Sequence, residues 1–141
     1  MTKEQVIVDI KVPNQTRYLS LIGSIGEDIA CILDAFTGDR EFLAYQLNLA
    51  LTEASTNAME HANSSDPEKF VRVCIRTTDD YIKAEVYDQG QGFDINSLPL
   101  PGVDALSDRG RGLLLIRAYM DSVSYQRTST GNVLRMIKHL K

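Results

Sequence analysis

Two pairs of short alternating segments constrain the fold of this chain more than any other feature. Residues 69–78, KFVRVCIRTT, and 81–90, YIKAEVYDQG, alternate apolar and polar side chains and are joined by two aspartates. This pattern is typical of a β-hairpin. Residues 122–129 and 132–140 repeat it around the turn TGN. Because the strands are grouped in hairpins, the sequence predicts a mostly antiparallel sheet.

One further strand and three helices complete the predicted order. Residues 5–13, QVIVDIKVP, alternate until Pro13 ends a first strand. Residues 14–36 have apolar side chains three and four apart, after the possible caps Asn14 and Thr16, and predict a helix that two glycines weaken. Its apolar positions are Tyr18, Leu21, Ile22, Ile25, Ile29, Ile32 and Leu33. Residues 42–62 and 113–123 predict two more helices.

The order β-α-α-β-β-loop-α-β-β predicts an α+β fold. We expect a two-layer α/β sandwich, with one mostly antiparallel mixed sheet and its helices on one face. With 43% hydrophobic residues in 141, the chain suits a single domain, residues 1–141, with a core of its own.

Charge and composition argue against several classes of protein. A net charge of −4 gives no reason to expect direct binding to nucleic acid. No apolar run approaches the roughly 20 residues that span a bilayer, and the amino terminus lacks the order of a signal peptide, so we expect a cytoplasmic protein without membrane contact. Cys31 and Cys74 lie far apart and only two histidines occur, so no disulfide framework or zinc site is indicated. Both cysteines are expected in the core.

The segment EASTNAMEH places Glu53, Asn57 and His61 four residues apart on the second predicted helix. At about 100° per residue, this helix has one apolar stripe, which we expect to face the sheet. The stripe contains Leu43, Leu47, Ala50, Leu51, Ala54 and Ala58. The three polar residues advance by about 40° per step and border that stripe. They form either a solvated edge, with His61 as a capping or core histidine, or one wall of a site.

A second feature, YDQGQGFD, ends a predicted strand at Asp88 and places Gly90 and Gly92 around one polar residue. Glycines here allow a close approach of the backbone to a ligand. An ordinary turn after a strand would look the same, so the motif alone does not decide between the two.

A third feature, SDRGRG, places Gly110 and Gly112 just before the third predicted helix, with Arg109 and Arg111 beside them. Free N–H groups at a helix start form an anion site, which two arginines would strengthen. A flexible lead-in to a helix is the alternative. Neither glycine pair completes a Walker A or GxGxxG motif.

Taken in order, ExxxNxxxH on a helix, DxGxGFD after a hairpin strand and GxG before a helix resemble the N, G1 and G2 boxes of the Bergerat-type, or GHKL, ATP-binding superfamily. The segments LALTEASTNAMEHA, VYDQGQGFD, RGRGLLLIRAYMDSVSY and VLRMIKHL look like those of its anti-sigma-factor serine/threonine kinases. The resemblance covers essentially the whole chain.

This resemblance implies a site for ATP and Mg²⁺. Asn57 would bind Mg²⁺, and Glu53 would act as general base toward the attacking hydroxyl. Asp88 would accept a hydrogen bond from the adenine amino group, and Gly90 and Gly92 would let the chain pass close to the base and ribose.

The same resemblance assigns the phosphate end of the site. Gly110 and Gly112 would give backbone N–H groups to the phosphates, and Arg109 would reach the γ-phosphate with Arg111 beside it. His61 would have a supporting role. The family often has a threonine that helps bind adenine where this chain has Asn132, and asparagine can still donate and accept there.

The partners implied by the family are a serine on a small anti-anti-sigma factor with a STAS domain, which accepts the phosphate, and a sigma factor held inactive. A homodimer is also expected. The alternative is an ATP-binding regulatory module that binds proteins without kinase activity and would not need Glu53. A purely structural interaction domain would require three independent coincidences in the right order.

Overall fold

The computed structural model of the protein describes residues 5–34, 36–90 and 108–140, and of residues 108–111 only the backbone. Its sheet has the strand order β1-β2-β3-β5-β4, and neighbouring strands pair antiparallel. The strands are β1 (Val6–Pro13), β2 (Phe70–Thr77), β3 (Tyr81–Asp88), β4 (Ser122–Arg127) and β5 (Asn132–His139). Both predicted hairpins are confirmed. The prediction of a mostly antiparallel sheet is confirmed, and every pairing among the described strands is antiparallel.

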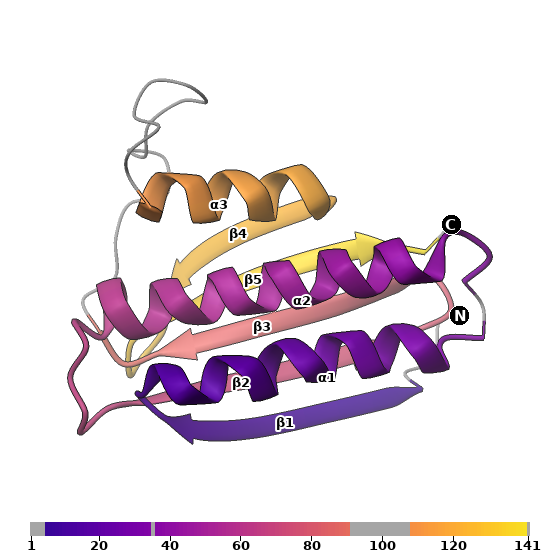
Figure 1. The fold of residues 1–141 in the computed structure, drawn as a ribbon. Helices are drawn as coiled ribbons and strands as arrows, with labels where there is room; N and C mark the ends of the chain where they lie inside the picture. The colour runs from indigo at the N-terminus through magenta and orange to yellow at the C-terminus, as the bar shows by residue number, and fades with distance from the viewer. Residues whose placement is uncertain (1–4, 35, 91–107, 141) are drawn as a thin grey trace.

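The helices are η1 (Thr16–Tyr18), α1 (Leu19–Ile32), α2 (Arg40–Asn57), η2 (Ala58–Ala62) and α3 (Asp108–Tyr119). All three predicted helices are present and lie over the same face of the sheet (Figure 1). Asp39 caps α2 by accepting a hydrogen bond from the backbone N–H of Phe42 at 3.1 Å. In the part of the chain that the structure describes, no helix combines the length and apolar character needed to cross a membrane.

The first helix starts later than its sequence predicts. Thr16 opens a single 3₁₀ turn, and neither it nor Asn14 caps α1 with its side chain. Asn14 instead donates its amide to the carbonyl oxygens of Met59 at 3.2 Å and Asp66 at 3.0 Å. Its side chain is used for a contact far away in the sequence, and the prediction of an Asn14 cap was wrong.

The third helix starts earlier than predicted, at Asp108 rather than near residue 113, and ends at Tyr119. Gly110 and Gly112 therefore belong to its first turns and do not precede it. Glycine lowers helix propensity, and the pattern of apolar residues begins only at Leu113. These two features made the start of α3 look like a loop in the sequence.

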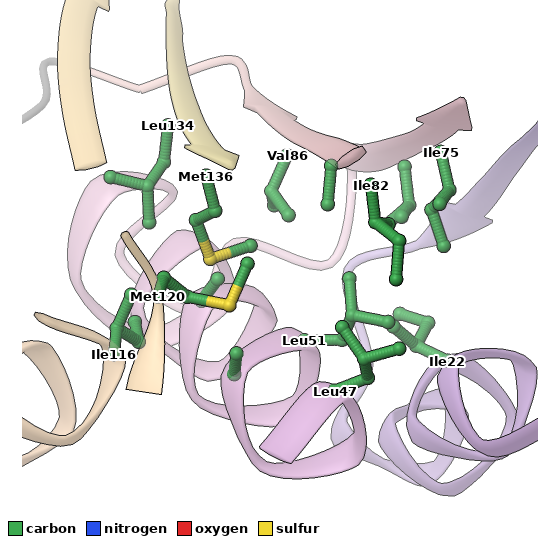
Figure 2. Close-up of a cluster of buried hydrophobic side chains, with 14 of the residues drawn as sticks. Ile22, Leu47, Leu51, Ile75, Ile82, Val86, Ile116, Met120, Leu134 and Met136 are labelled. Atoms are coloured by element: carbon green, nitrogen blue, oxygen red, sulfur yellow. The ribbon is translucent and has the colours of Figure 1, made fainter. Parts of the chain in front are cut away.

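The core lies between the sheet and the helix layer. Figure 2 shows side chains from β2, β3 and β5 pointing toward those of α1, α2 and α3, with Met120 and Met136 between them. The predicted stripe of α2 is confirmed, because each of its six residues is at most 5% exposed. Burial of this stripe orients α2, and with it the polar residues that border the stripe.

Two glycines let α1 lie very close to α2. A Cβ atom on Gly23 would stand 2.6 Å from Asn48 Oδ1, and one on Gly26 would stand 2.7 Å from Leu51 Cδ1. The side of α1 that faces α2 thus includes these glycines. Two side chains expected on the apolar face, Leu21 and Ile32, are instead 52% and 57% exposed.

The two cysteines differ in their surroundings. Cys74 is buried as expected, whereas Cys31 is exposed. Cys31 lies near the end of α1, on the side that neither the sheet nor α2 covers. The prediction that both are core residues was therefore right for Cys74 only.

Candidate nucleotide site

Residues Glu53 and Asn57 occupy the last turns of α2, at the border of its buried stripe. Asn57 is 3% exposed, and its Nδ2 atom has no hydrogen-bond partner. Gly112 of α3 lies directly against both residues. A Cβ atom on Gly112 would stand 2.7 Å from Glu53 Oε2 and 3.5 Å from Asn57 Nδ2. The first and third sequence motifs therefore meet, and a side chain at position 112 would displace the Glu53 carboxylate.

The helix widens immediately after Asn57. Residues Ala58–Ala62 form the π-helical segment η2, and the N–H of Asn63 donates to the carbonyl of Ala58 at 2.8 Å. Single π turns inside or at the end of α-helices are frequent at functional sites. His61 lies in this segment and is partly buried. It does not continue the α-helical spacing that relates Glu53 to Asn57, so its supporting role stays a prediction.

Asp88 ends β3, and the residue is only 4% exposed. Its Oδ1 accepts from Asn132 Nδ2 at 2.8 Å and from the N–H of Gly90 at 3.0 Å. Its Oδ2 accepts from the Tyr125 hydroxyl at 3.2 Å. An ionised carboxylate has about four acceptor sites. Three donors fix the orientation of this one and leave capacity for a further donor.

Glycines allow two close approaches around this strand end. A Cβ atom on Gly90 would overlap the carbonyl group of Ala62, and one on Gly131 would overlap the carbonyl group of Asp88. The chain after β3 thus packs directly on η2, and the β4–β5 turn packs directly on the end of β3. Gly90 is needed for this packing whether or not a ligand is bound.

A buried pair of asparagines holds η2 and the end of β3 together. Asn63 accepts from the N–H of Gln89 at 2.8 Å and donates to Asn14 Oδ1 and the Phe70 carbonyl, both at 3.1 Å. Asn63 is completely buried. In the sequence it belongs to a cluster of turn formers, NSSDP, and was not identified as a site residue. Its burial depends on partners that no local pattern reveals.

A cavity connects Asn57 with Asp88. It is lined by Ala54, Asn57, Ala58, Val86, Asp88, Tyr125 and Leu134. Its walls are mostly apolar, with an amide at one end and a carboxylate at the other. Its volume is only about 10 Å³, room for a single water molecule, so it marks a narrow gap between the two ends of the site and not a formed pocket for a base. Tyr125 was missed by sequence reasoning, since it looks like an ordinary member of an alternating strand.

Four of the predicted site residues have no described side-chain position. Gly92 lies outside the described residues. Arg109, Gly110 and Arg111 are placed by their backbone, in the first turn of α3. Their roles in holding phosphate stay predictions.

The donor set is compatible with Mg²⁺. The described residues contain no group of three or more His, Cys, Asp or Glu side chains that could enclose a metal ion. Nucleotide-bound Mg²⁺ does not need such a cage, because it takes most of its ligands from phosphates and water and few from protein. The buried, unpartnered amide of Asn57 fits this role, because its oxygen and nitrogen can exchange places by rotation of the amide.

Comparison with known proteins agrees with this geometry. The family profile described as "Histidine kinase-like ATPase domain" matches residues 19–138. Serine-protein kinase RsbW of Staphylococcus epidermidis is 30% identical over 150 residues, which cover 100% of this chain and 91% of that protein. RsbW of Bacillus subtilis is 31% identical and that of Bacillus licheniformis 33%, each over 94% of this chain and 85% of the relative.

The fold is also found in a solved histidine kinase structure. The histidine kinase domain of a blue-light activated histidine kinase from Erythrobacter litoralis EL346 superposes with a TM-score of 0.54 at 21% identity. The match covers 92% of this chain and 62% of that one, so this chain spans less than two thirds of the histidine kinase. The family profile matches most of the chain, and the alignments with the relatives cover most of both sequences. The chain therefore belongs to the histidine kinase-like ATPase domain family and, within it, to the serine-protein kinases of the RsbW type.

Proposed function

We propose that this protein is an anti-sigma factor serine kinase. It would bind ATP with Mg²⁺, phosphorylate a serine on an anti-anti-sigma factor with a STAS domain, and sequester a sigma factor in the cytoplasm. The names of the relatives support the kinase class. The observation that carries the proposal is the position of Gly112, which brings the start of α3 against Glu53 and Asn57.

At the base end of the site, Asp88 would accept a hydrogen bond from the adenine amino group. The Asn132 amide and the Gly90 N–H hold its Oδ1. Oδ2, which has only the longer bond from Tyr125, would be the acceptor for the base. Asn132 thus acts on Asp88 from the position where the family often has threonine.

At the phosphate end, the first turns of α3 carry free N–H groups and the positive end of the helix dipole. Arg109, Gly110 and Arg111 lie there, and the missing side chain of Gly112 lets the α3 backbone come close to α2. Asn57 would hold Mg²⁺, which supplies charge neutralisation on the phosphates when it is bound. Glu53, half buried beside Asn57, would accept the proton of the attacking serine hydroxyl.

A labelled-phosphate transfer assay tests the proposal, with a purified STAS-domain protein from the source cell as acceptor. Wild-type protein is expected to transfer label to serine. Glu53→Gln should keep ATP affinity within about twofold and lose transfer by about 10²-fold or more, since general bases contribute that much. An active Glu53→Gln variant would show that another group is the base. ATP binding without transfer in the wild type would support the regulatory module without kinase activity.

Partner switching would follow from the product. A phosphoserine adds nearly two negative charges at neutral pH, which disfavours an interface built for a neutral hydroxyl. Phosphorylated acceptor would therefore leave the kinase, which could then hold the sigma factor. We also propose a homodimer, and a monomer mass at micromolar concentration would contradict that part alone.

A further inference from the structure

The face of the sheet opposite the helices is strongly basic. In Figure 1 all three α-helices lie on one side of the sheet, and none of the described helices lies over the strands' other side. Among the described strand residues, the charged side chains that alternation directs to this open face are five basic and two acidic. They are Lys11, Arg72, Arg76, Lys83 and Arg135, with Asp9 and Glu85. This surplus of three positive charges lies on a chain whose net charge is −4.

Both acidic side chains on this face are hydrogen-bonded to arginines. Asp9 accepts from Arg72 through both oxygens, at 2.9 and 2.7 Å. This contact lowers the pKa of Asp9. The Glu85 side chain is only 9% exposed and accepts from Arg135 at 2.9 Å. Each pair neutralises one acid and one arginine, so the described strand residues of this face keep their surplus of positive charge.

A cavity of about 180 Å³ opens on this face near the end of β3. Two cation and aromatic pairs form its walls, with Lys11 Nζ 4.5 Å from the Phe70 ring centre and the Arg72 guanidinium carbon 5.0 Å from that of Tyr87. Asp88, Gln89 and Thr130 complete the lining. Flat apolar walls beside cations suit an apolar or aromatic side chain that is flanked by carboxylates.

We propose that the open sheet face binds an acidic segment of a partner protein, with this cavity, the Lys11–Tyr87 pocket, as the anchor for one apolar side chain. The inference does not depend on phosphoryl transfer. One observation favours a protein over a nucleic acid. A surplus of three charges is small beside the roughly 6–10 phosphate contacts of DNA-binding proteins.

The test is an NMR titration of the full ¹⁵N-labelled chain with the synthetic peptide GEEFEEG. We expect saturable shifts confined to β1, β2, β3 and β5, and clearly weaker binding of GQQFQQG and GKKFKKG. Lys11→Glu should lower the affinity for the acidic peptide by about tenfold, because one attraction is lost and one repulsion is gained. Arg17→Glu, on η1, makes the same change of charge away from this face and should have no effect.

Melting temperature and ATP affinity should be unchanged in Lys11→Glu, which separates this site from the nucleotide site and from misfolding. No saturable shift at millimolar peptide, equal binding of GQQFQQG, or shifts on the helices would overturn the proposal. Tighter binding of dT12 or of phosphatidylserine vesicles at the same amides would also overturn it, in favour of nucleic acid or membrane. If the wild type has the mass of a dimer in solution and Lys11→Glu has that of a monomer, the face binds a second copy of this chain instead.

Discussion

Replacing Asn132 by alanine should destabilise the protein measurably. Asn132 is 3% exposed and donates to Asp88 Oδ1 at 2.8 Å and to the carbonyl of Gly90 at 3.1 Å. Alanine would leave both acceptors without this donor. A hydrogen bond to a charged group contributes about 1.5–3 kcal/mol and a neutral one about 0.5–1.5, so we expect a loss of about 2–4 kcal/mol.

In a domain of this size, 1 kcal/mol shifts the melting temperature by about 3–4 °C, so the Asn132→Ala variant should melt about 6–15 °C lower. Circular dichroism without nucleotide measures this shift, and calorimetric titration measures ATP affinity, which should fall because Asp88 loses orientation. Asn132→Thr is the matched control, since its hydroxyl can donate one bond and should give an intermediate value. Tyr125→Phe removes the 3.2 Å bond to Asp88 Oδ2 but leaves both bonds of Asn132 in place, so it should cost less stability than Asn132→Ala.

The order of these variants is the decisive result. If Asn132→Ala melts within about 2 °C of the wild type, the hydrogen bonds of Asn132 contribute little and water replaces them. If Asn132→Thr is as damaged as Asn132→Ala, a single hydroxyl cannot substitute for the amide at this position. Loss of ATP affinity without loss of stability would mean that Asn132 acts on the ligand and not on Asp88.

Three further predictions concern other parts of the molecule. Gly90→Ala should lower the free energy of unfolding by at least about 2 kcal/mol in urea, because its Cβ would overlap the Ala62 carbonyl; an unchanged midpoint would contradict that packing. Chelation of Mg²⁺ should weaken ATP binding in the wild type but not in Asn57→Ala, and equal weakening in both would remove the assignment of Asn57. The hydrogen bond from Arg72 lowers the pKa of Asp9 below its ordinary value of 3.8. The ion pair therefore stabilises the fold fully above pH 3.8, and this stabilisation is lost as pH falls through the lower pKa of the folded state. Asp9→Asn should therefore be slightly less stable than wild type at pH 7, and the difference should shrink as pH falls below 3.8; a difference that stays the same would refute the ionic contribution.

Local periodicity was sufficient to predict the sheet and the position of α2. Strand alternation has a period of two and the stripe of α2 a period near 3.6, and both patterns come from burial of one face. This is why all five strands were predicted to within two residues at each end, and why the buried face of α2 was correct from Leu43 to Ala58. The bordering position of Glu53 and Asn57 followed from the same argument.

The errors lie where a side chain's role is set by distant parts of the chain. Asn14 resembled a helix cap, but its amide bonds near η2, some 45 residues away. Asn63 and Tyr125 gave no signal, since a turn former and a strand aromatic have many possible positions. The prediction for Cys31 followed the general tendency of cysteine to be buried, but this residue is exposed near the end of α1.

The two ends of the proposed nucleotide site are held by one continuous piece of backbone. Asn57 ends α2 where η2 begins, and Ala62 ends η2 against Gly90, just beyond Asp88. Asn63, which follows η2, accepts a hydrogen bond from the N–H of Gln89, the residue after Asp88. Because η2 carries both contacts, the distance between the phosphate end and the base end is set inside the protein before any ligand binds. Such preorganisation reduces the entropy lost on binding, and it explains why a π-helical segment is kept at this point despite its poorer intrinsic stability.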